Sequence, residues 1–326
     1  MFDESTVNLA SDLHISKIIN IINAFRQRSS LVTYVKRNPD VMIHVHTSIG
    51  WTLLKDLFII SKIRKNTKSK IILSIHFAEL NKIVSSVAAI RKYELNVLKK
   101  CVDEVIFLSR KTQEEFVAEG VDPHKTSVLY TFHDFETNME KDTKTIIGSP
   151  VKLLFVGSID KRKGILDLLE VIGRISDQNI SLDICGIIND ESIRAEYENK
   201  VKSLANIVVE HGYVNGTEKR EIFSDSDILI LPSYGEGMPI VIMEGMASGN
   251  AIISTKVGSI PEIVSAENGI LIDPGDRVAL ENAIMSFLNN DSYLKETKLN
   301  NIRKGMSFGL VSNIESLCSI YNKYDK

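Results

Sequence analysis

Residues 232–249 read PSYGEGMPIVIMEGMASG and follow the apolar run 227–231. This order predicts a strand, then a glycine-rich loop, then a helix. Pro239 suits the first helical position, because that position needs no backbone N–H. The N–H groups of Gly237 and Met238 would then point out of the positive end of the helix dipole. The stretch therefore predicts a site for a phosphate or a sugar hydroxyl.

Two carboxylates belong to this stretch, with Glu236 in the loop and Glu244 about one turn into the helix. We expect both to reach one pocket. The string of Pro-Ser, Glu-Gly-x-Pro and Glu-x-Met-Ala-x-Gly resembles the donor-site signature of glycosyltransferase family 4, the retaining GT-B enzymes. The alternative interpretation is an ordinary strand–loop–helix turn with two surface glutamates.

The resemblance implies an α/β fold of the GT-B type, with two Rossmann-like domains facing a cleft. The chain has the matching pattern, because short apolar runs alternate with longer amphipathic segments. We expect domains at 1–148 and 149–326, a polar linker at 136–150, and a last helix (about 308–326) that packs back on the first domain. The expected strands are 41–45, 71–75, 104–108, 127–130, 152–156, 181–184, 207–209, 228–231, 251–254 and 269–272.

The start of the chain departs from the family, which the remainder resembles over residues 36–325. These enzymes open with an apolar strand and a glycine-rich loop. This chain opens with a polar, glycine-free segment followed by the helix-like pattern 15–28. We therefore expect an N-terminal domain that lacks its first strand and loop, through a misassigned start codon or a truncated gene.

A second motif lies in the loop after the strand 152–156. By the family pattern, Gly157 ends that strand and Lys163 binds the donor diphosphate. The family often has arginine where this chain has Ser158. Either Arg162 supplies that charge, since its planar fork suits phosphate, or Lys163 and backbone N–H groups hold the diphosphate alone. The alternative is a basic turn that only caps the strand.

The family pattern assigns further roles. Glu236 would bind sugar hydroxyls, Glu244 would bind the ribose, and Ser233 would lie where the Pro-Ser loop meets the donor. Gly186 and Tyr213 would border the base, although Tyr213 either stacks on the base or packs in the core. The residues expected to bind the donor are Gly157, Ser158, Gly186, Tyr213, Ser233, Gly237, Met238, Pro239 and Glu244.

Histidines end two expected strands. His76 follows the strand 71–75 and matches a family histidine that faces the sugar; otherwise it is a hydrogen-bonded cap. His44 and His46 alternate along the strand before it, which places both on one face. A metal pair there is conceivable, but we see no third ligand nearby. Retaining GT-B enzymes are thought to need neither metal nor protein nucleophile, so we expect no cofactor and assign catalysis to Glu236, Lys163, Arg162 and His76.

Bulk composition limits the function classes. The 326 residues carry a net charge of −3, which argues against general nucleic-acid binding. Three scattered cysteines form no disulfide framework and fit a reducing cytoplasm. No apolar run is long enough to span a membrane. A basic run is either a solvated helix end or a contact with anionic lipid headgroups; its members are Lys62, Arg64, Lys65, Lys68 and Lys70.

The expected protein is a retaining glycosyltransferase that acts at the cytoplasmic face of the plasma membrane. It would move a hexose-type sugar from a UDP- or GDP-sugar to a glycan or polyprenyl-linked acceptor of a surface polysaccharide. The alternatives are a noncatalytic or partner-dependent nucleotide-sugar-binding protein and a GT-B-fold epimerase. The sequence leaves open the base, the sugar, the acceptor, the linkage and the oligomeric state.

Overall fold

The computed structural model describes residues 31–77, 80–135 and 149–324, without the side chains of 81 and 82. The chain divides into two compact units. Unit 1 lies within Met1–His76, Leu80–Ile106 and Glu115–Ser127, and unit 2 within Phe77–Glu79, Phe107–Glu114 and Val128–Lys326. The expected opening segment, the helix-like pattern 15–28 and most of the expected linker fall outside the described residues, so those predictions and the division at 148/149 stay predictions.

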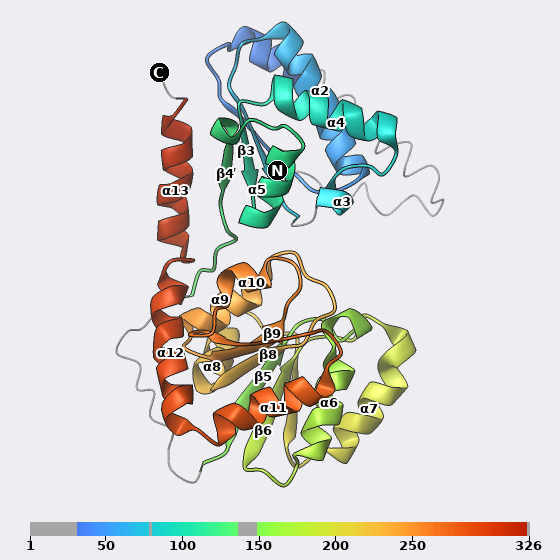
Figure 1. Ribbon diagram of the computed structural model, residues 1–326, viewed down its shortest axis with the longest axis vertical. Helices are drawn as coiled ribbons and strands as arrows, with labels where there is room; N and C mark the ends of the chain where they lie inside the picture. Colours follow the sequence, from blue (N-terminus) through green and yellow to red (C-terminus); the bar gives the residue numbers. More distant parts are fainter. Residues whose placement is uncertain (1–30, 78–79, 136–148, 325–326) are drawn as a thin grey trace. The chain divides into compact units, whose positions relative to one another are not determined.

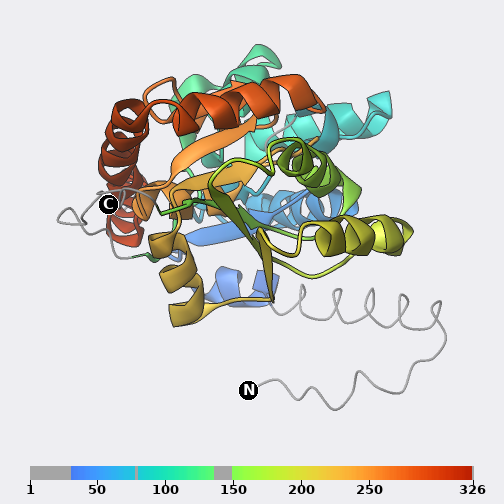
Figure 2. The ribbon, with the colours of Figure 1, turned by 90° about the horizontal axis from the view of Figure 1, so that it is seen from below.

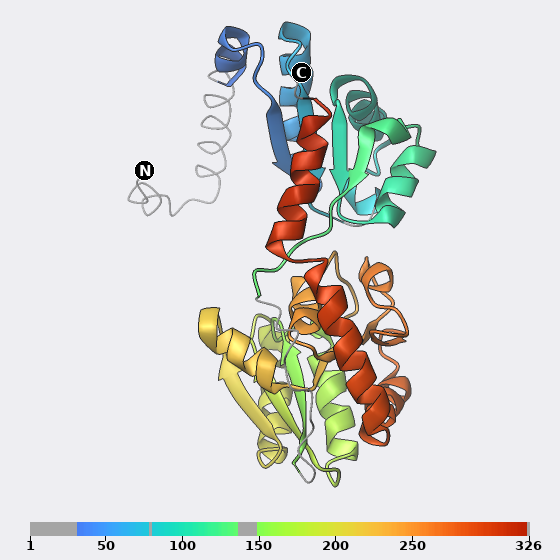
Figure 3. The same cartoon turned by 90° about the vertical axis from the view of Figure 1, so that its left-hand side faces the viewer.

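A four-stranded sheet lies in unit 1. Only Phe107 and Val128, the last residues of its third and fourth strands, are assigned to unit 2. Its strands stand in the order β1 (Ile43–Thr47), β2 (Ile71–Ile75), β3 (Glu104–Phe107) and β4 (Thr126–Val128). The pairing of β1 with β2 is parallel and sets His46 opposite Ser74. Figure 3 shows β1, in blue, at one edge of this sheet. The helices of unit 1 are α2 (Trp51–Asn66), α3 (Leu80–Ile83) and α4 (Ala88–Cys101), and residues 31–37 are also helical. Helix α5 (Arg110–Ala118) is shared, because its residues up to Glu114 belong to unit 2.

Unit 2 contains a six-stranded parallel sheet in the order β10-β9-β8-β5-β6-β7. The strand order reverses between β5 and β8: β6 and β7 follow β5 on one side, and β9 and β10 follow β8 on the other. A doubly wound sheet leaves a crevice at the carboxyl ends of its strands at such a point. The strands are β5 (Val151–Val156), β6 (Ile180–Cys185), β7 (Val208–Gly212), β8 (Ile228–Leu231), β9 (Ala251–Thr255) and β10 (Gly269–Ile272).

Helices cover both faces of the unit 2 sheet (Figures 1 and 2). Helices α6, α7 and α11 lie on one face, and α8 and α9 lie on the other. Helix α12 packs against α9 and α11. The bounds are α6 (Ile165–Arg174), α7 (Arg194–Ser203), α8 (Gly216–Asp225), α9 (Ile240–Ala247), α10 (Ile260–Ile263), α11 (Arg277–Leu288), α12 (Asp291–Met306) and α13 (Leu310–Asn322).

The apolar runs of the sequence form strands whose residues are largely buried. Every residue of β2, β8 and β9 is buried, which requires apolar side chains on both faces. The expected strands all occur, with ends that differ by at most three residues. One helix position was wrong: α9 begins at Ile240, and Pro239 is the extended residue before it rather than the first helical residue. Among the described residues, no helix is long and apolar enough to cross a bilayer.

Candidate functional site

The two predicted donor motifs meet in unit 2 through one buried ion pair. Lys163 Nζ lies 2.6 Å from Glu236 Oε1, and the side chains are 13% and 7% exposed. The Ser233 hydroxyl donates a second hydrogen bond, also 2.6 Å long, to the same oxygen. The Asp160 carboxylate caps the short helix that carries Lys163 by accepting from its backbone N–H. The structure therefore brings together three residues that the sequence assigned to the donor site.

Arg162 borders this ion pair from the solvent side. Its Nη1 donates to the Gly235 carbonyl at 2.9 Å and lies 3.7 Å from Glu236 Oε2. The guanidinium is about half exposed. Ser158, which replaces the expected arginine, donates instead to the Asp160 carboxylate. Of the three basic residues in this loop, Arg162 and Lys163 are the two that contact Glu236.

Glycine allows the lysine loop and the strand β8 loop to approach closely. Gly164 has a φ of 71°, and a Cβ there would lie 2.1 Å from the Pro232 carbonyl oxygen. A side chain at this position would therefore both strain the backbone and overlap a carbonyl. The Tyr234 hydroxyl secures the second loop by donating to Asp167, and this bond is the main reason that the pKa of Tyr234 is raised.

A second glycine, Gly258, lets the segment after β9 pack against the backbone of Glu236. Gly258 has a φ of 55°, and its missing Cβ would fall 2.2 Å from the Glu236 carbonyl oxygen. The next residue, Ser259, donates both its backbone N–H and its hydroxyl to the Gly237 carbonyl. The segment after β9 therefore holds the Glu236 loop against the sheet.

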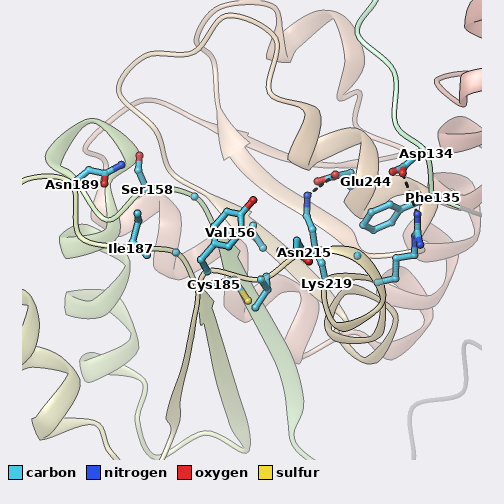
Figure 4. Close-up of a pocket in the computed structure, with 16 residues that line it drawn as sticks. Asp134, Phe135, Val156, Ser158, Cys185, Ile187, Asn189, Asn215, Lys219 and Glu244 are labelled. Carbon is cyan, nitrogen blue, oxygen red and sulfur yellow. Dashed lines mark hydrogen bonds and ion pairs between the residues drawn. The ribbon is translucent and has the colours of Figure 1, made fainter. Parts of the chain in front are cut away.

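A pocket of about 460 Å³ lies beside this cluster, at the carboxyl ends of β5 and β6 (Figure 4). Five predicted donor-binding residues line it: Gly157, Ser158, Gly186, Tyr213 and Glu244. Glu236 is not among its lining residues, so the expectation that both glutamates reach one pocket stays a prediction. Other predicted residues that do not line it are Arg162, Lys163, Ser233, Gly237, Met238 and Pro239.

Close backbone packing shapes the floor of the pocket. The Gly186 N–H donates to the Gly212 carbonyl at 2.7 Å, and a Cβ on Gly186 would lie 1.9 Å from the Gly157 carbonyl oxygen. Glycine is thus required here by contact between two loops. The neighbouring thiol of Cys185 also lines the pocket, and burial raises its pKa to about 12.

The side chains of Tyr213 and Met238 differ sharply in exposure. Tyr213 is 72% exposed at the pocket, so packing in the core is excluded for it. Met238 is buried, and its sulfur accepts a hydrogen bond from the Thr131 N–H. Only the backbone of Met238 is therefore suited to a ligand.

The sequence reading missed the charged side chains that α8 contributes to the pocket. Lys219 Nζ lies 2.6 Å from Glu244 Oε1, and Arg220 pairs with Asp134 at 3.1 Å. Lys219 also lies over the rings of Phe135 and Phe223, 5.7 and 5.8 Å from their centroids. No motif marks these residues, because the contacts join segments far apart in the sequence.

Unit 1 contains a cluster of three histidines that the sequence only partly predicted. His44 and His46 share a face of β1, with ring centroids 4.2 Å apart, as their spacing indicated. His76 follows β2, and its Nε2 lies 2.8 Å from His46 Nδ1. The sequence had not indicated that His76 lies beside this pair. The pKa values of His44 and His76 are both lowered, mainly by burial and secondly by the charge of His46. The pKa of His44 falls to about 4.

Histidine proximity does not make this cluster a metal centre. Within the described residues, no group of three or more His, Cys, Asp or Glu side chains has the arrangement to hold a metal ion. His76 also belongs to unit 1, whereas Glu236 belongs to unit 2. Its approach to a donor sugar stays a prediction.

Comparisons with known proteins agree with this fold. Residues 150–290 match the family described as Glycosyl transferases group 1. An uncharacterized 41.2 kDa protein in the cps region of Klebsiella pneumoniae is 28% identical over 243 residues, which is 72% of this chain and 65% of that protein. A putative teichuronic acid biosynthesis glycosyltransferase, TuaC of Bacillus subtilis, is 28% identical over 56% of this chain and 46% of that protein. The chain thus spans about half to two thirds of these relatives' length.

A solved structure extends the likeness to both units. HepE from Anabaena, crystallised in complex with UDP, superposes with a TM-score of 0.73 at 16% identity, covering 91% of this chain and 82% of that one. The class of fold is therefore GT-B. Within that class, residues 150–290 resemble the group 1 glycosyltransferases, in agreement with the resemblance that residues 232–249 carry.

Proposed function

We propose that this chain is a retaining glycosyltransferase of surface polysaccharide synthesis. It takes a hexose-type sugar from a nucleotide-sugar donor and passes it to a glycan or lipid-linked acceptor, without a metal ion. The observation that carries the proposal is the contact of Lys163 with Glu236 beside the Glu244 pocket. Unit 2 thereby holds Lys163 as a cation for the diphosphate, Glu236 as a carboxylate for the sugar and Glu244 as a carboxylate for the ribose.

The chemistry of transfer fits these side chains. Departure of the nucleoside diphosphate develops negative charge, which Lys163 and Arg162 are suited to stabilise. In a retaining reaction of this type, the leaving phosphate oxygen takes the acceptor proton on the face from which it departs. Glu236 would grip the sugar hydroxyls during that step. The names of the relatives, one in a cps region and one in teichuronic acid synthesis, support a polysaccharide product.

Calorimetric titration of the chain with UDP, GDP and ADP tests the donor site. We expect one of the three to bind and Glu244→Ala to lose most of that affinity. The matched control is Glu267→Ala, an exposed carboxylate of unit 2 that does not line the pocket. Absence of binding by all three nucleotides to a folded chain would refute the proposal.

A turnover assay separates transfer from the alternatives. The sugar form of the bound nucleotide is incubated with lipid-linked and glycan acceptors, and products are analysed by mass spectrometry and by NMR of the new anomeric centre. A sugar that stays on the nucleotide with changed configuration would identify an epimerase. Binding without turnover would identify a noncatalytic or partner-dependent protein. Equal rates with and without EDTA are expected of a metal-independent enzyme.

We further propose that helix α2 of unit 1 contacts an anionic membrane from the cytoplasmic side. Trp51 is 69% exposed and Phe58, two turns further on, is 41% exposed. Lys62 lies over the Phe58 ring, 4.6 Å from its centroid. Aromatic rings and lysines side by side suit a lipid interface. Part of the basic run is structural instead, because Arg64 bonds the Cys101 carbonyl and the Asp103 carboxylate.

Vesicle sedimentation tests the membrane contact. We expect binding to vesicles that contain phosphatidylglycerol, little binding to pure phosphatidylcholine, and weaker binding after Trp51→Ala. Equal sedimentation of the wild type and the variant with anionic vesicles would contradict a role for this helix.

A further inference from the structure

Three histidine rings lie side by side on one face of the unit 1 sheet. His44 and His46 alternate along β1, and His76 directly follows β2. The parallel register sets His46 opposite Ser74. The His76 N–H donates to the Thr47 carbonyl, which continues the pairing of the two strands to this residue. His76 therefore projects from the same face as His46, at the carboxyl ends of the strands, where parallel sheets of this kind bind ligands.

A buried serine anchors this row of rings at one end. The Nε2 atom of His44 lies 2.7 Å from the Oγ of Ser74, a residue that is 6% exposed. The ring of His44 packs against the ring of His46, with centroids 4.2 Å apart. His46 Nδ1 in turn lies 2.8 Å from His76 Nε2, and the planes of these two rings differ by 19°. Each ring is therefore held by its neighbour, from the buried serine to His76.

The contact with His46 orders a side chain that is otherwise exposed. An exposed imidazole without a partner exchanges between rotamers, and fixing it costs conformational entropy. The hydrogen bond occupies Nε2 of His76. The other ring nitrogen, Nδ1, makes no hydrogen bond with any residue that the structure describes. It is the ring nitrogen that remains for a ligand.

The same contact also decides what Nδ1 of His76 can do. Partial burial of the ring, followed by the charge of His46, lowers the pKa of His76, so the imidazole is neutral near pH 7. A neutral imidazole has one donor nitrogen and one acceptor nitrogen. A partner on Nε2 therefore sets the tautomer, and with it the role that Nδ1 offers to a hydroxyl.

We propose that His46 is a positioning residue for sugar transfer, which acts by fixing the ring orientation and the tautomer of His76 so that Nδ1 of His76 faces a sugar hydroxyl. This inference rests on the proposed function and on the predicted approach of His76 to the sugar. A polar group that is oriented before the reaction stabilises the transition state without the cost of ordering it at that moment. Loss of His46 should thus slow the chemical step more than it weakens donor binding, because the proposed nucleotide-binding residues belong to unit 2.

The test is a double-mutant cycle on transfer, with kcat and KM for the nucleotide-sugar measured in each chain. We expect His46→Ala to lower kcat about 10-fold, the effect of losing one hydrogen bond that orders a side chain, and to change KM less than about 2-fold. The variant His76→Ala should lower kcat at least as much. The double variant should be no slower than His76→Ala, because His46 acts only through His76.

A conservative variant and a control separate positioning from folding. His46→Asn keeps a short side chain that can donate or accept at the same place, so it should recover most of the lost kcat. His124→Ala, at an exposed histidine of unit 1 outside the row, should keep the wild-type rate. NMR of the ring nitrogens gives a readout independent of turnover. We expect one tautomer of His76 in the wild type and a mixture in His46→Ala.

Three results would overturn the role of His46 and leave the proposed function standing. They are a wild-type kcat in His46→Ala or in His76→Ala, independent losses that multiply in the double variant, and an unchanged His76 tautomer in His46→Ala. If the wild-type chain transfers sugar to none of the acceptors, the role of His46 and the proposed function fail together.

Discussion

Lys163 Nζ lies 2.6 Å from Glu236 Oε1, so the cation expected on the donor diphosphate is already paired with the carboxylate expected on the donor sugar. Both side chains are largely buried, which strengthens their attraction relative to a surface pair. A diphosphate that binds Lys163 has to compete with Glu236. The sugar compensates for this loss, because its hydroxyls can replace the lysine as partners of the carboxylate.

Glu236→Gln separates these two roles. The amide keeps the size of the side chain but does not compete as a charge for Lys163. We therefore expect the bound nucleoside diphosphate to bind at least as tightly as in the wild type, up to about 10-fold more tightly. Transfer should fall by about 100-fold or more, because the charged grip on the sugar is lost. Calorimetry and an initial-rate assay measure the two effects.

Lys163→Met is the companion variant for that experiment. It should lose both nucleotide affinity and turnover, because the diphosphate then lacks its buried cation. A Glu236→Gln variant that loses nucleotide affinity as strongly as Lys163→Met would contradict competition between the carboxylate and the diphosphate.

Gly164→Ala should destabilise unit 2 by about 2–4 kcal/mol, because the new Cβ would meet the Pro232 carbonyl and because the backbone has a positive φ. Gly173→Ala is the matched control. Gly173 is an exposed residue inside helix α6 with open space where its Cβ would be, so alanine there should stabilise by about 0.5–1 kcal/mol. Urea unfolding followed by circular dichroism gives both values. A Gly164→Ala variant as stable as the wild type would show that the two loops can separate at no cost.

The fold could be predicted from the sequence because its strands are continuous apolar runs of the length that a buried parallel strand requires. Runs such as 228–231 and 269–272 coincide with β8 and β10. Helix boundaries were less predictable. Helices α3 and α4 are separated by a break between Ile83 and Ala88, which the amphipathic period of the sequence does not mark.

The site could be predicted where its residues belong to a motif and not where only tertiary packing assembles it. Lys163, Glu236 and Ser233 lie in recognisable loops and meet in the structure. Lys219 lies on a polar helix whose sequence resembles any solvated helix, and Phe135 reaches the pocket from the segment before the second sheet. The third histidine was missed for the same reason, since the parallel pairing of β1 and β2, and not sequence distance, brings His76 to His46.

His44 should make unit 1 less stable in acid. Its pKa is lowered to about 4 in the folded chain, mainly by burial, from an ordinary value of 6.5. Above pH 6.5 the imidazole is neutral in both states, and its stability contribution is complete. As the pH falls from 6.5 towards 4, the unfolded chain takes up the proton first, so stability is lost over that window. His76, whose pKa is also lowered, acts in the same direction.

His44→Gln tests this acid sensitivity. The variant should lose less unfolding free energy than the wild type between pH 7 and pH 5, by on the order of 1 kcal/mol after allowing for solvent screening. His124→Gln, at an exposed histidine of the same unit, serves as the control and should follow the wild type. Urea titrations at several pH values provide the measurement. Parallel pH profiles for all three chains would rule His44 out as the source.

The three cysteines should differ sharply in their reaction with iodoacetamide at pH 8. Cys318 is exposed, Cys101 is half-buried, and Cys185 is buried at the pocket with a thiol pKa raised to about 12. Because the thiolate is the nucleophile, only about one Cys185 thiol in 10,000 is reactive at that pH. We expect Cys318 to be labelled more than 100-fold faster than Cys185 in peptides analysed by mass spectrometry, and all three to be labelled alike in urea. Rapid labelling of Cys185 in the folded chain would mean that the strands under the pocket open readily. It would contradict the burial of this thiol at the pocket.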